Sequence, residues 1–345
     1  MNGKTSGKKM NSNNLLLLIT LLLFIGMYAI GCVIYASKGF THVQTFLNLF
    51  TQNAGLICVA CGMTCVMLTG GIDISVGSLI AMDCMILADG MTNKHWNCIA
   101  TIIFILAIGI VFGIVQGFLV SYLEIQPFIV TMAGMFFARG MTAVINTDQV
   151  SITQEGNAMF YAWANAKITL PEFLGYANKK GNIIAPFIRP SVVVALLVVV
   201  VIWIVLKYTK FGRVLYAVGG NETSARMMGL NVRKTKMQAY ILSSFLCSIG
   251  GILFCLNTMT GAVTQAKGFE MTAIASAVIG GTLLTGGVGN VWGSLVGVLI
   301  TATIQTLVMT NGKLLSSWSN IMTAALLCLF ILLQSVFAYI KDRNK

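Results

Sequence analysis

Long apolar runs separated by short polar stretches make up most of this chain. A bilayer core about 30 Å thick needs about 20 apolar residues per crossing helix, and continuous apolar runs argue against the alternating pattern of a membrane β-barrel. The pattern predicts an all-α polytopic membrane protein with about ten transmembrane helices. We place them near residues 15–35, 48–69, 74–90, 97–122, 126–146, 188–207, 237–257, 271–285, 291–310 and 320–340. Segments 74–90 and 271–285 are short or broken by glycine, so each of them either crosses the membrane or is re-entrant.

Polar stretches set the limits of one membrane domain, residues 15–340. The first apolar run is too long for the h-region of a signal peptide and lacks a small-residue cleavage site, so we expect an uncleaved first span. We assign the stretches as a cytoplasmic leader (1–14), an external loop (147–189), a cytoplasmic loop (207–236) and a cytoplasmic tail (341–345).

The cytoplasmic loop carries the signals of a short helix. Asn221 is a good N-cap, Glu222 favours the positive end of the helix, and Gly229 supplies the left-handed residue that ends it. Two interpretations remain open. The loop either touches anionic lipid headgroups through its lysines and arginines, or it presents a docking helix to a partner protein.

A glycine-rich phrase occurs twice, as LTGGIDISVGSLIA at 68–81 and LTGGVGNVWGSLVG at 284–297. Without a gap, seven of the fourteen positions are identical, and the same offset of 216 residues relates several apolar segments. Internal duplication around glycine-rich helix breaks is typical of transporters. Whether the two copies point the same way or oppositely stays open, because it depends on whether an intervening segment is re-entrant.

Composition agrees with a membrane protein, since 57% of residues are hydrophobic and 9% are charged. Soluble domains average about 25% charged residues. The net charge of +12 could suggest nucleic acid, but its placement favours the bilayer: with Met1 in the cytoplasm, thirteen of the 22 lysines and arginines lie inside. That bias follows the positive-inside rule, so we predict no nucleic-acid partner.

Catalytic and metal-binding motifs are missing from the sequence. Cys58, Cys61 and Cys65 share one helix face, yet only two histidines accompany the nine cysteines, so we interpret them as small side chains packed between helices. No phosphate-binding loop, zinc-protease motif or nucleophile elbow occurs. We therefore predict no metal, no cofactor, no ATPase site and no enzyme activity of its own.

Only a few charged groups lie within the apolar segments, and they give most of the candidate substrate-pathway residues. Charges in hydrocarbon tend to pair or to line a path, so Asp83 and Arg139 are either an ion pair or pathway residues. Asp73 and Asn290 follow the two glycine clusters, and helix capping is the favoured role for both. Alternatively, these helix N-termini face a polar substrate. The complete set is Asp73, Ser75, Asp83, Arg139 and Asn290.

Several long motifs together resemble the permeases of bacterial ABC importers of the ribose, xylose and galactose class. The resemblance covers residues 46–338, nearly the whole chain, and its motifs are LTGGIDISVGS at 68–78, GGNETSARMMGLNV at 219–232 and AIASAVIGGTLLTGGVGNVWGSLVG at 273–297. Two further motifs, PFIVTMAGMFFARG at 127–140 and LSSWSNI at 315–321, look most like a permease of the galactofuranose importer.

This resemblance implies a multi-pass permease of the bacterial inner membrane that works with a second permease subunit, either as a homodimer or as a heterodimer. It also implies a separate ATP-binding cassette ATPase, an extracytoplasmic sugar-binding protein and transport of a monosaccharide, with galactofuranose first and ribose or another pentose or hexose next. The coupling helix to the ATPase would comprise Asn221, Glu222, Ala225, Arg226 and Gly229.

Two other classes of function compete with this interpretation. An ion-coupled secondary transporter would also show repeats and broken helices, but it usually needs an acidic residue inside the membrane, and Asp83 is the only one well inside a segment. A membrane enzyme is disfavoured because the sequence lacks a nucleophile and base arrangement.

Overall fold

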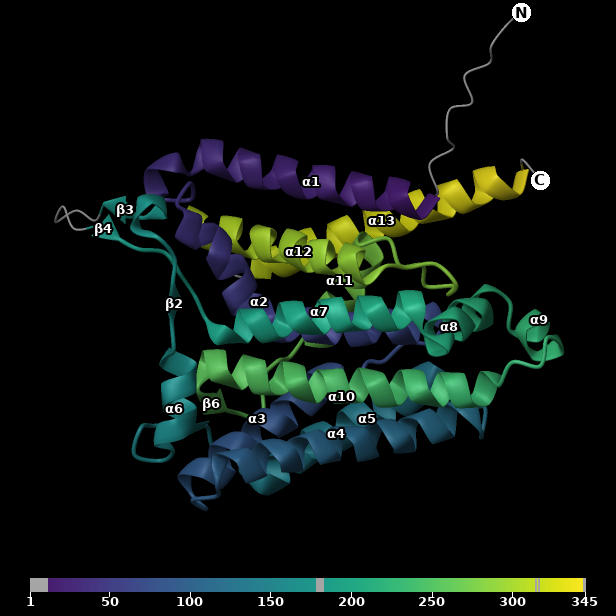
Figure 1. Ribbon diagram of the computed structural model, residues 1–345, viewed down its shortest axis with the longest axis horizontal. Helices are drawn as coiled ribbons and strands as arrows, with labels where there is room; N and C mark the ends of the chain where they lie inside the picture. Colours follow the sequence, from purple (N-terminus) through teal and green to yellow (C-terminus); the bar gives the residue numbers. More distant parts are fainter. Residues whose placement is uncertain (1–11, 178–182, 314, 316, 344–345) are drawn as a thin grey trace, which may run out of the picture.

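Each of the ten predicted apolar segments contains a helix in the computed structural model, which describes residues 12–177, 183–313, 315 and 317–343. The long helices run side by side (Figure 1). Their bounds are α1 (Ser12–Ile34), α2 (Val43–Leu68), α3 (Val76–Thr92), α4 (Cys98–Ser121), α5 (Pro127–Ile145), α7 (Pro190–Tyr208), α10 (Val232–Thr258), α11 (Phe269–Ile279), α12 (Val291–Asn311) and α13 (Ser317–Arg343).

Within the described residues, seven helices are long and apolar enough to cross a membrane: α1, α2, α4, α5, α7, α10 and α12. The helices in the two doubtful segments are shorter, since α3 has 17 residues and α11 has 11. The chain is therefore an all-α polytopic membrane protein. The figure of ten crossings stays a prediction.

The connecting elements gather at the two ends of the bundle (Figure 1). One end carries the segment predicted as the external loop, with three two-stranded antiparallel pairs. The elements at this end of the bundle, from the loop and from other parts of the chain, are η1 (Ala36–Lys38), β1 (Val150–Ser151), α6 (Ala158–Asn165), β2 (Ile168–Thr169), η2 (Glu172–Leu174), β3 (Tyr176–Ala177), β4 (Ile183–Ile184), β5 (Phe187–Ile188) and β6 (Thr260–Gly261). The opposite end carries α8 (Lys210–Gly220) and α9 (Glu222–Met227), together with the start of α1 and the end of α13.

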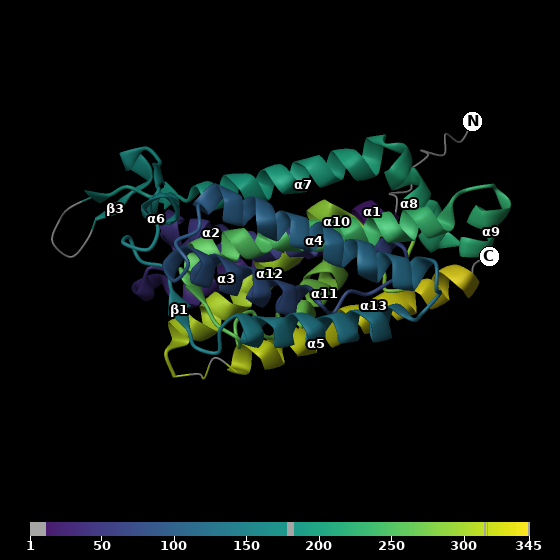
Figure 2. The ribbon, with the colours of Figure 1, turned by 90° about the horizontal axis from the view of Figure 1, so that it is seen from below.

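Burial separates the central helices from those that face outward. In α2, 89% of its most apolar window is buried, against 17% in α1 and 22% in α5. Seen from below, α7 lies on one side of the bundle and α5 with α13 on the other (Figure 2). The exposed residues of the outer helices are mostly large and apolar, as expected of surfaces that contact lipid.

The two copies of the glycine-rich phrase meet in the interior. The backbone N–H of Gly287 donates to the carbonyl oxygen of Leu68 at 3.0 Å, and a Cβ on Gly286 would lie only 2.8 Å from the nitrogen of Gly70. Glycine is required here because the two backbones approach each other without side chains between them.

From this contact α3 and α12 run in the same direction. The far end of α3 hydrogen-bonds β1 through Thr92 and the carbonyl of Ser151, and the far end of α12 reaches the start of η1 through Asn311 and Tyr35. Both targets lie at the strand end of the bundle. The orientation left open by the sequence is thus the same for both helices.

Candidate functional site

Helix α9 has the caps that the sequence predicts. The Asn221 side chain accepts from the N–H of Ser224 at 2.8 Å. Gly229 adopts a left-handed φ of 76°, and the N–H of the next residue, Leu230, donates to the carbonyl of Ala225 at 3.1 Å. The predicted N-cap and left-handed terminator are therefore confirmed, and both follow from local sequence alone.

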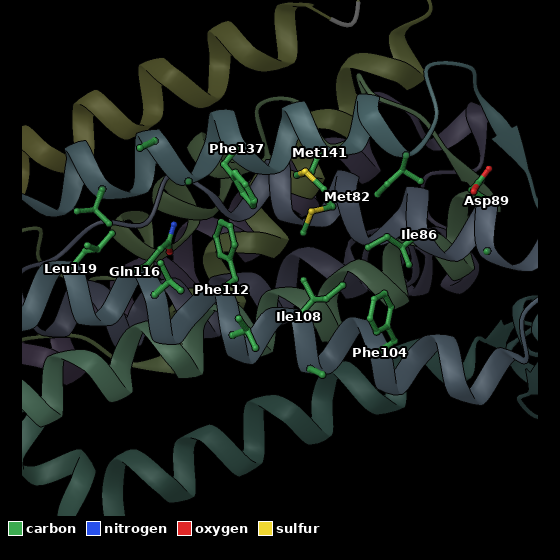
Figure 3. Close-up of a pocket in the computed structure, with 18 of the residues that line it drawn as sticks. Met82, Ile86, Asp89, Phe104, Ile108, Phe112, Gln116, Leu119, Phe137 and Met141 are labelled. Atoms are coloured by element: carbon green, nitrogen blue, oxygen red, sulfur yellow. The ribbon is translucent and has the colours of Figure 1, made fainter. Parts of the chain in front are cut away.

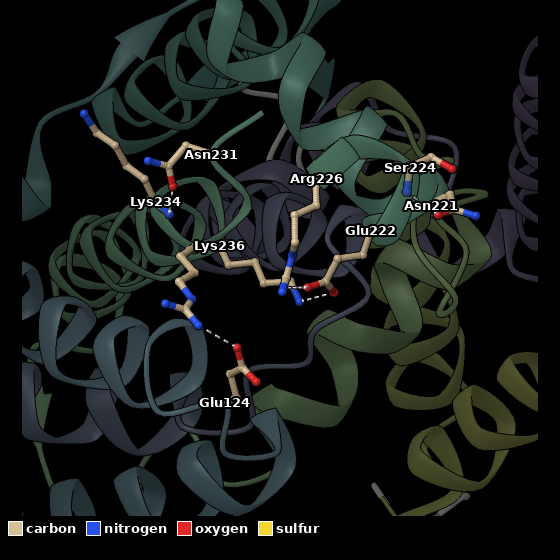
Figure 4. A network of polar contacts seen from close by, with 9 residues as sticks. Glu124, Asn221, Glu222, Ser224, Arg226, Asn231, Lys234 and Lys236 are labelled. Carbon is tan, nitrogen blue, oxygen red and sulfur yellow. Dashed lines mark hydrogen bonds and ion pairs between the residues drawn. The ribbon is translucent and has the colours of Figure 1, made fainter. Parts of the chain in front are cut away.

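One ion pair joins α9 to α10, and a second lies within α9 (Figure 4). The Glu222 carboxylate lies 2.9 Å from Nη2 of Arg226 and 2.5 Å from Nζ of Lys236. These hydrogen bonds and charges, that of Lys236 first, hold the pKa of Glu222 below its usual value. A further pair at 3.0 Å joins Arg233 to Glu124 beside the start of α5.

Helix α9 buries a small apolar side chain and leaves two large, flexible side chains exposed at its end. Ala225 is fully buried with Val218 and Val232. Met227 and Met228, in contrast, are 77% and 67% exposed. Flexible, polarizable methionines on an exposed surface suit binding to another protein. The sequence analysis missed these two residues and Lys236, although two adjacent methionines in a polar loop are visible in the sequence.

Asp73 and Ser75 lie in the interior, in the turn between α2 and α3. The Asp73 carboxylate accepts from the backbone N–H and the hydroxyl of Ser75, at 3.1 and 2.6 Å, and from the hydroxyl of Ser243 on α10 at 3.0 Å. Both residues are fully buried. Asp73 therefore stabilises the turn before α3 instead of capping the helix itself, where Ser75 is the N-cap.

Asn290 does cap its helix. Its side-chain oxygen accepts from the N–H of Trp292 at 3.1 Å at the start of α12. The capping role predicted for Asn290 is confirmed, and the side chain is half-buried.

Asp83 and Arg139 do not form the candidate ion pair. Arg139 on α5 donates to the carbonyl oxygens of Val263 and Gln265, at 2.6 and 2.8 Å. Asp83 is fully buried against Gly251 of α10. Ser248 lies beside its carboxyl group without completing a hydrogen bond, and neither carboxyl oxygen has a hydrogen-bond partner among the described residues. The hypothesis of an Asp83–Arg139 ion pair is wrong, because the Arg139 guanidinium donates its hydrogen bonds to two backbone carbonyl oxygens instead.

A cavity of about 790 Å³ lies between α3, α4 and α5 (Figure 3). Its wall is largely apolar, with side chains such as Met82, Phe112 and Phe137, and it includes Asp89 and Gln116. None of the five predicted pathway residues lines it. A sugar needs several converging polar groups, so this cavity does not have the lining of a sugar site.

Comparisons with known proteins agree on one family. Residues 45–332 match the family model described as branched-chain amino acid transport system / permease component. The chain is 39% identical to the inner membrane ABC transporter permease protein YjfF of Escherichia coli K12, over 92% of each chain. It is 33% identical to the fructose import permease protein FruG of Bifidobacterium longum, over 95% of this chain and 93% of that one. It is 34% identical to the ribose import permease protein RbsC of Escherichia coli K12, over 82% of each. No solved structure gives a significant match.

Proposed function

This chain belongs to the family of branched-chain amino acid transport system permease components, and from that membership we propose that it is the permease subunit of an ATP-driven importer of one monosaccharide. Relatives named as fructose and ribose import permeases support the sugar class. The chain is a multi-pass inner-membrane transport component without its own ATPase site.

Galactofuranose is the substrate that we propose first. Its support is the resemblance of residues 127–140 and 315–321 to a galactofuranose permease. Ribose or another pentose or hexose is the alternative, because the named relatives include ribose and fructose permeases. The partners we propose are a second permease subunit, an extracytoplasmic sugar-binding protein and a separate ATPase.

One observation carries the coupling proposal: a capped helix at the end of the bundle predicted to be cytoplasmic, in a chain with no nucleotide-binding motif. The ion pair between Glu222 and Lys236 joins α9 to α10, while Met227 and Met228 stay exposed. We propose that this surface contacts the ATPase. Nucleotide-driven movement would then reach the permease through α9 and α10.

Uptake into proteoliposomes tests the transport proposal. The chain is reconstituted with its candidate partner permease and ATPase, the binding protein is supplied, and ribose, fructose, galactose and galactofuranose are offered with and without ATP. Uptake that requires ATP hydrolysis is expected. Uptake driven by an ion gradient without ATP would contradict the proposal and favour a secondary transporter.

Three variants test the coupling surface in the same assay. Met227→Asp, Arg226→Glu and Gly229→Val are each expected to lower ATP-driven uptake at least 10-fold while membrane insertion is unchanged. Lys210→Glu, an exposed position on α8 outside this surface, is the control and should transport normally. Normal uptake by Met227→Asp would count against docking through α9.

Of the five pathway residues, Arg139 and Asn290 are the two that are not fully buried. We propose that Arg139 lies beside the path and acts by holding the carbonyls of Val263 and Gln265, and that Asn290 is a helix cap at the path's inner end. For Asp73, Ser75 and Asp83 we propose a role in helix packing, because their side chains are enclosed in this structure.

A further inference from the structure

The segment from Met259 to Glu270 comprises the non-helical connection between α10 and α11, which ends at Gly268, and the first two residues of α11. Residues 260–261 form β6, and residues 263–268 form consecutive turns. Non-helical backbone at membrane depth is tolerated only where it is buried in protein or lines a water-filled space. This segment is therefore expected to contact protein or water and not lipid.

Several contacts from other parts of the chain fix the segment. β6 pairs with β1, and the N–H of Ile152 donates to the carbonyl of Met259 at 2.8 Å. Farther along, the Arg139 guanidinium on α5 holds the carbonyls of Val263 and Gln265. The Gln265 side chain accepts from the N–H of Ala262 at 3.0 Å and donates to the hydroxyl of Thr258 at 2.9 Å.

The segment is also strained and ends on an unsatisfied group. Met259 and Ala266 have left-handed φ values of 54° and 52°, which are uncommon for residues other than glycine. Such strain clusters at functional sites. Glu270 lies against Gly77 in the first turn of α3, and its buried Oε2 has no hydrogen-bond partner among the described residues.

Polar side chains remain exposed on this segment. Thr264 and Lys267 are both exposed, and Gln265 is half-exposed. Arg139, which contacts the segment, lies six residues before the end of α5, about 9 Å along the helix at 1.5 Å per residue. An exposed lysine and threonine near that depth face water more favourably than lipid.

We propose that the segment Met259–Glu270 forms the polar wall of the sugar path in the outer half of the membrane. Lys267 and Thr264 contact the hydroxyl groups of the sugar, and Arg139 is the positioning residue that holds the segment in place. The inference rests on the proposed sugar transport, and it adds the residues and the segment that contact the substrate.

Thiol labelling tests the wall without depending on transport. Lys267→Cys, Thr264→Cys and Leu197→Cys are placed in the chain, which is assembled with its partners in right-side-out vesicles and treated with the membrane-impermeant cation methanethiosulfonate ethyltrimethylammonium. The unchanged chain provides the background from its own cysteines. Leu197 on α7 is 59% exposed but apolar in its surroundings, so it is the matched control for lipid contact.

We expect labelling at 267 and 264 at least 10-fold faster than at 197. Saturating concentrations of the transported sugar should slow the labelling at 267. Labelling at 267 no faster than at 197 would overturn the proposal, as would disulfide cross-linking of Lys267→Cys between two subunits, which would show a subunit interface. The labelling rates do not depend on ATP-driven uptake. The experiment therefore distinguishes a failure of the proposed sugar contact from a failure of the transport proposal.

Transport kinetics test the positioning role of Arg139. Arg139→Ala frees both carbonyls, and we expect the KM for sugar to rise at least 5-fold and the labelling rate at 267 to change. Arg139→Lys keeps a donor and should recover part of the KM. A variant that only lowers the amount of folded protein would reduce the maximal rate and leave KM unchanged, and that result would overturn the role.

Discussion

At the residue scale, two aspartates of equal burial have opposite surroundings. Asp73 accepts three hydrogen bonds from Ser75 and Ser243, whereas Asp83 has no completed hydrogen bond among the described residues. A buried polar group is costly unless it is paired. The two side chains should therefore contribute to stability by different amounts.

Replacing each aspartate by alanine separates these contributions. Asp73→Ala leaves the N–H and hydroxyl of Ser75 and the hydroxyl of Ser243 without an acceptor, so we expect a loss of about 1–3 kcal/mol of stability. Asp83→Ala removes an unpartnered group and should cost less than about 1 kcal/mol. Thermal unfolding of the purified protein in detergent measures both, and equal losses at the two positions would refute the distinction.

At the element scale, backbone-to-backbone contact joins the turn after α2, the turn before α12 and the end of α8. A Cβ on Gly219 of α8 would overlap the carbonyl oxygen of Leu68 and crowd the nitrogen of Gly287. Helix α8 is thus packed directly on the place where the two repeated phrases meet. Movement of α9 and α8 would be transmitted to both phrases.

Two neighbouring glycines of α8 test this contact. Gly219→Ala forces the elements apart, so we expect a loss of about 3 kcal/mol or more, or failure to accumulate in the membrane. Gly220→Ala is the control, since nothing lies within 4 Å of a Cβ there. Thermal unfolding of the control should match the unchanged chain, and a tolerated Gly219→Ala would show that the contact is loose.

The ion pairs of α9 predict a pH dependence with a defined sign. Because its partners lower the pKa of Glu222 from 4.5 in the folded state, its stabilising contribution is complete above about pH 4.5 and is lost as pH falls through the lowered value. The side chain is 41% exposed, so solvent screening limits the contribution to about 1 kcal/mol or less.

The pH series compares the original chain with Glu222→Gln by thermal unfolding between pH 7 and pH 3. We expect a constant difference in stability down to about pH 4.5 and convergence of the two curves below it. A difference that grows toward acid pH would have the wrong sign and would exclude these ion pairs as its source.

At the scale of the whole molecule, the features that could be predicted from the sequence are those that depend on local pattern. Apolar runs located every long helix, and the caps at Asn221 and Asn290 followed from neighbouring residues. The partners of Arg139 could not be found this way, because the carbonyls it binds are 124 and 126 residues distant. The segment predicted as 271–285 is helical only to Ile279, since Gly281 and Gly286 adopt left-handed φ values.

The arrangement of the two ends also belongs to this scale. The strand end carries the segment 147–189, and the other end carries α8, α9, the start of α1 and the end of α13. Seven of the 22 lysines and arginines lie in the loop 207–236 at that second end. Basic loops stay in the cytoplasm, so we predict that the end with α8 and α9 faces the cytoplasm and the strand end faces outward.

Two single cysteines measure this orientation in intact cells. Glu155→Cys, exposed at the strand end, should react with an impermeant maleimide added outside, and Lys210→Cys, exposed on α8, should react only after the membrane is permeabilised. The chain without added cysteines gives the background for both. If position 210 reacts from outside and position 155 does not, the molecule is inverted, α9 faces away from cytoplasmic ATP, and the coupling proposal fails with it.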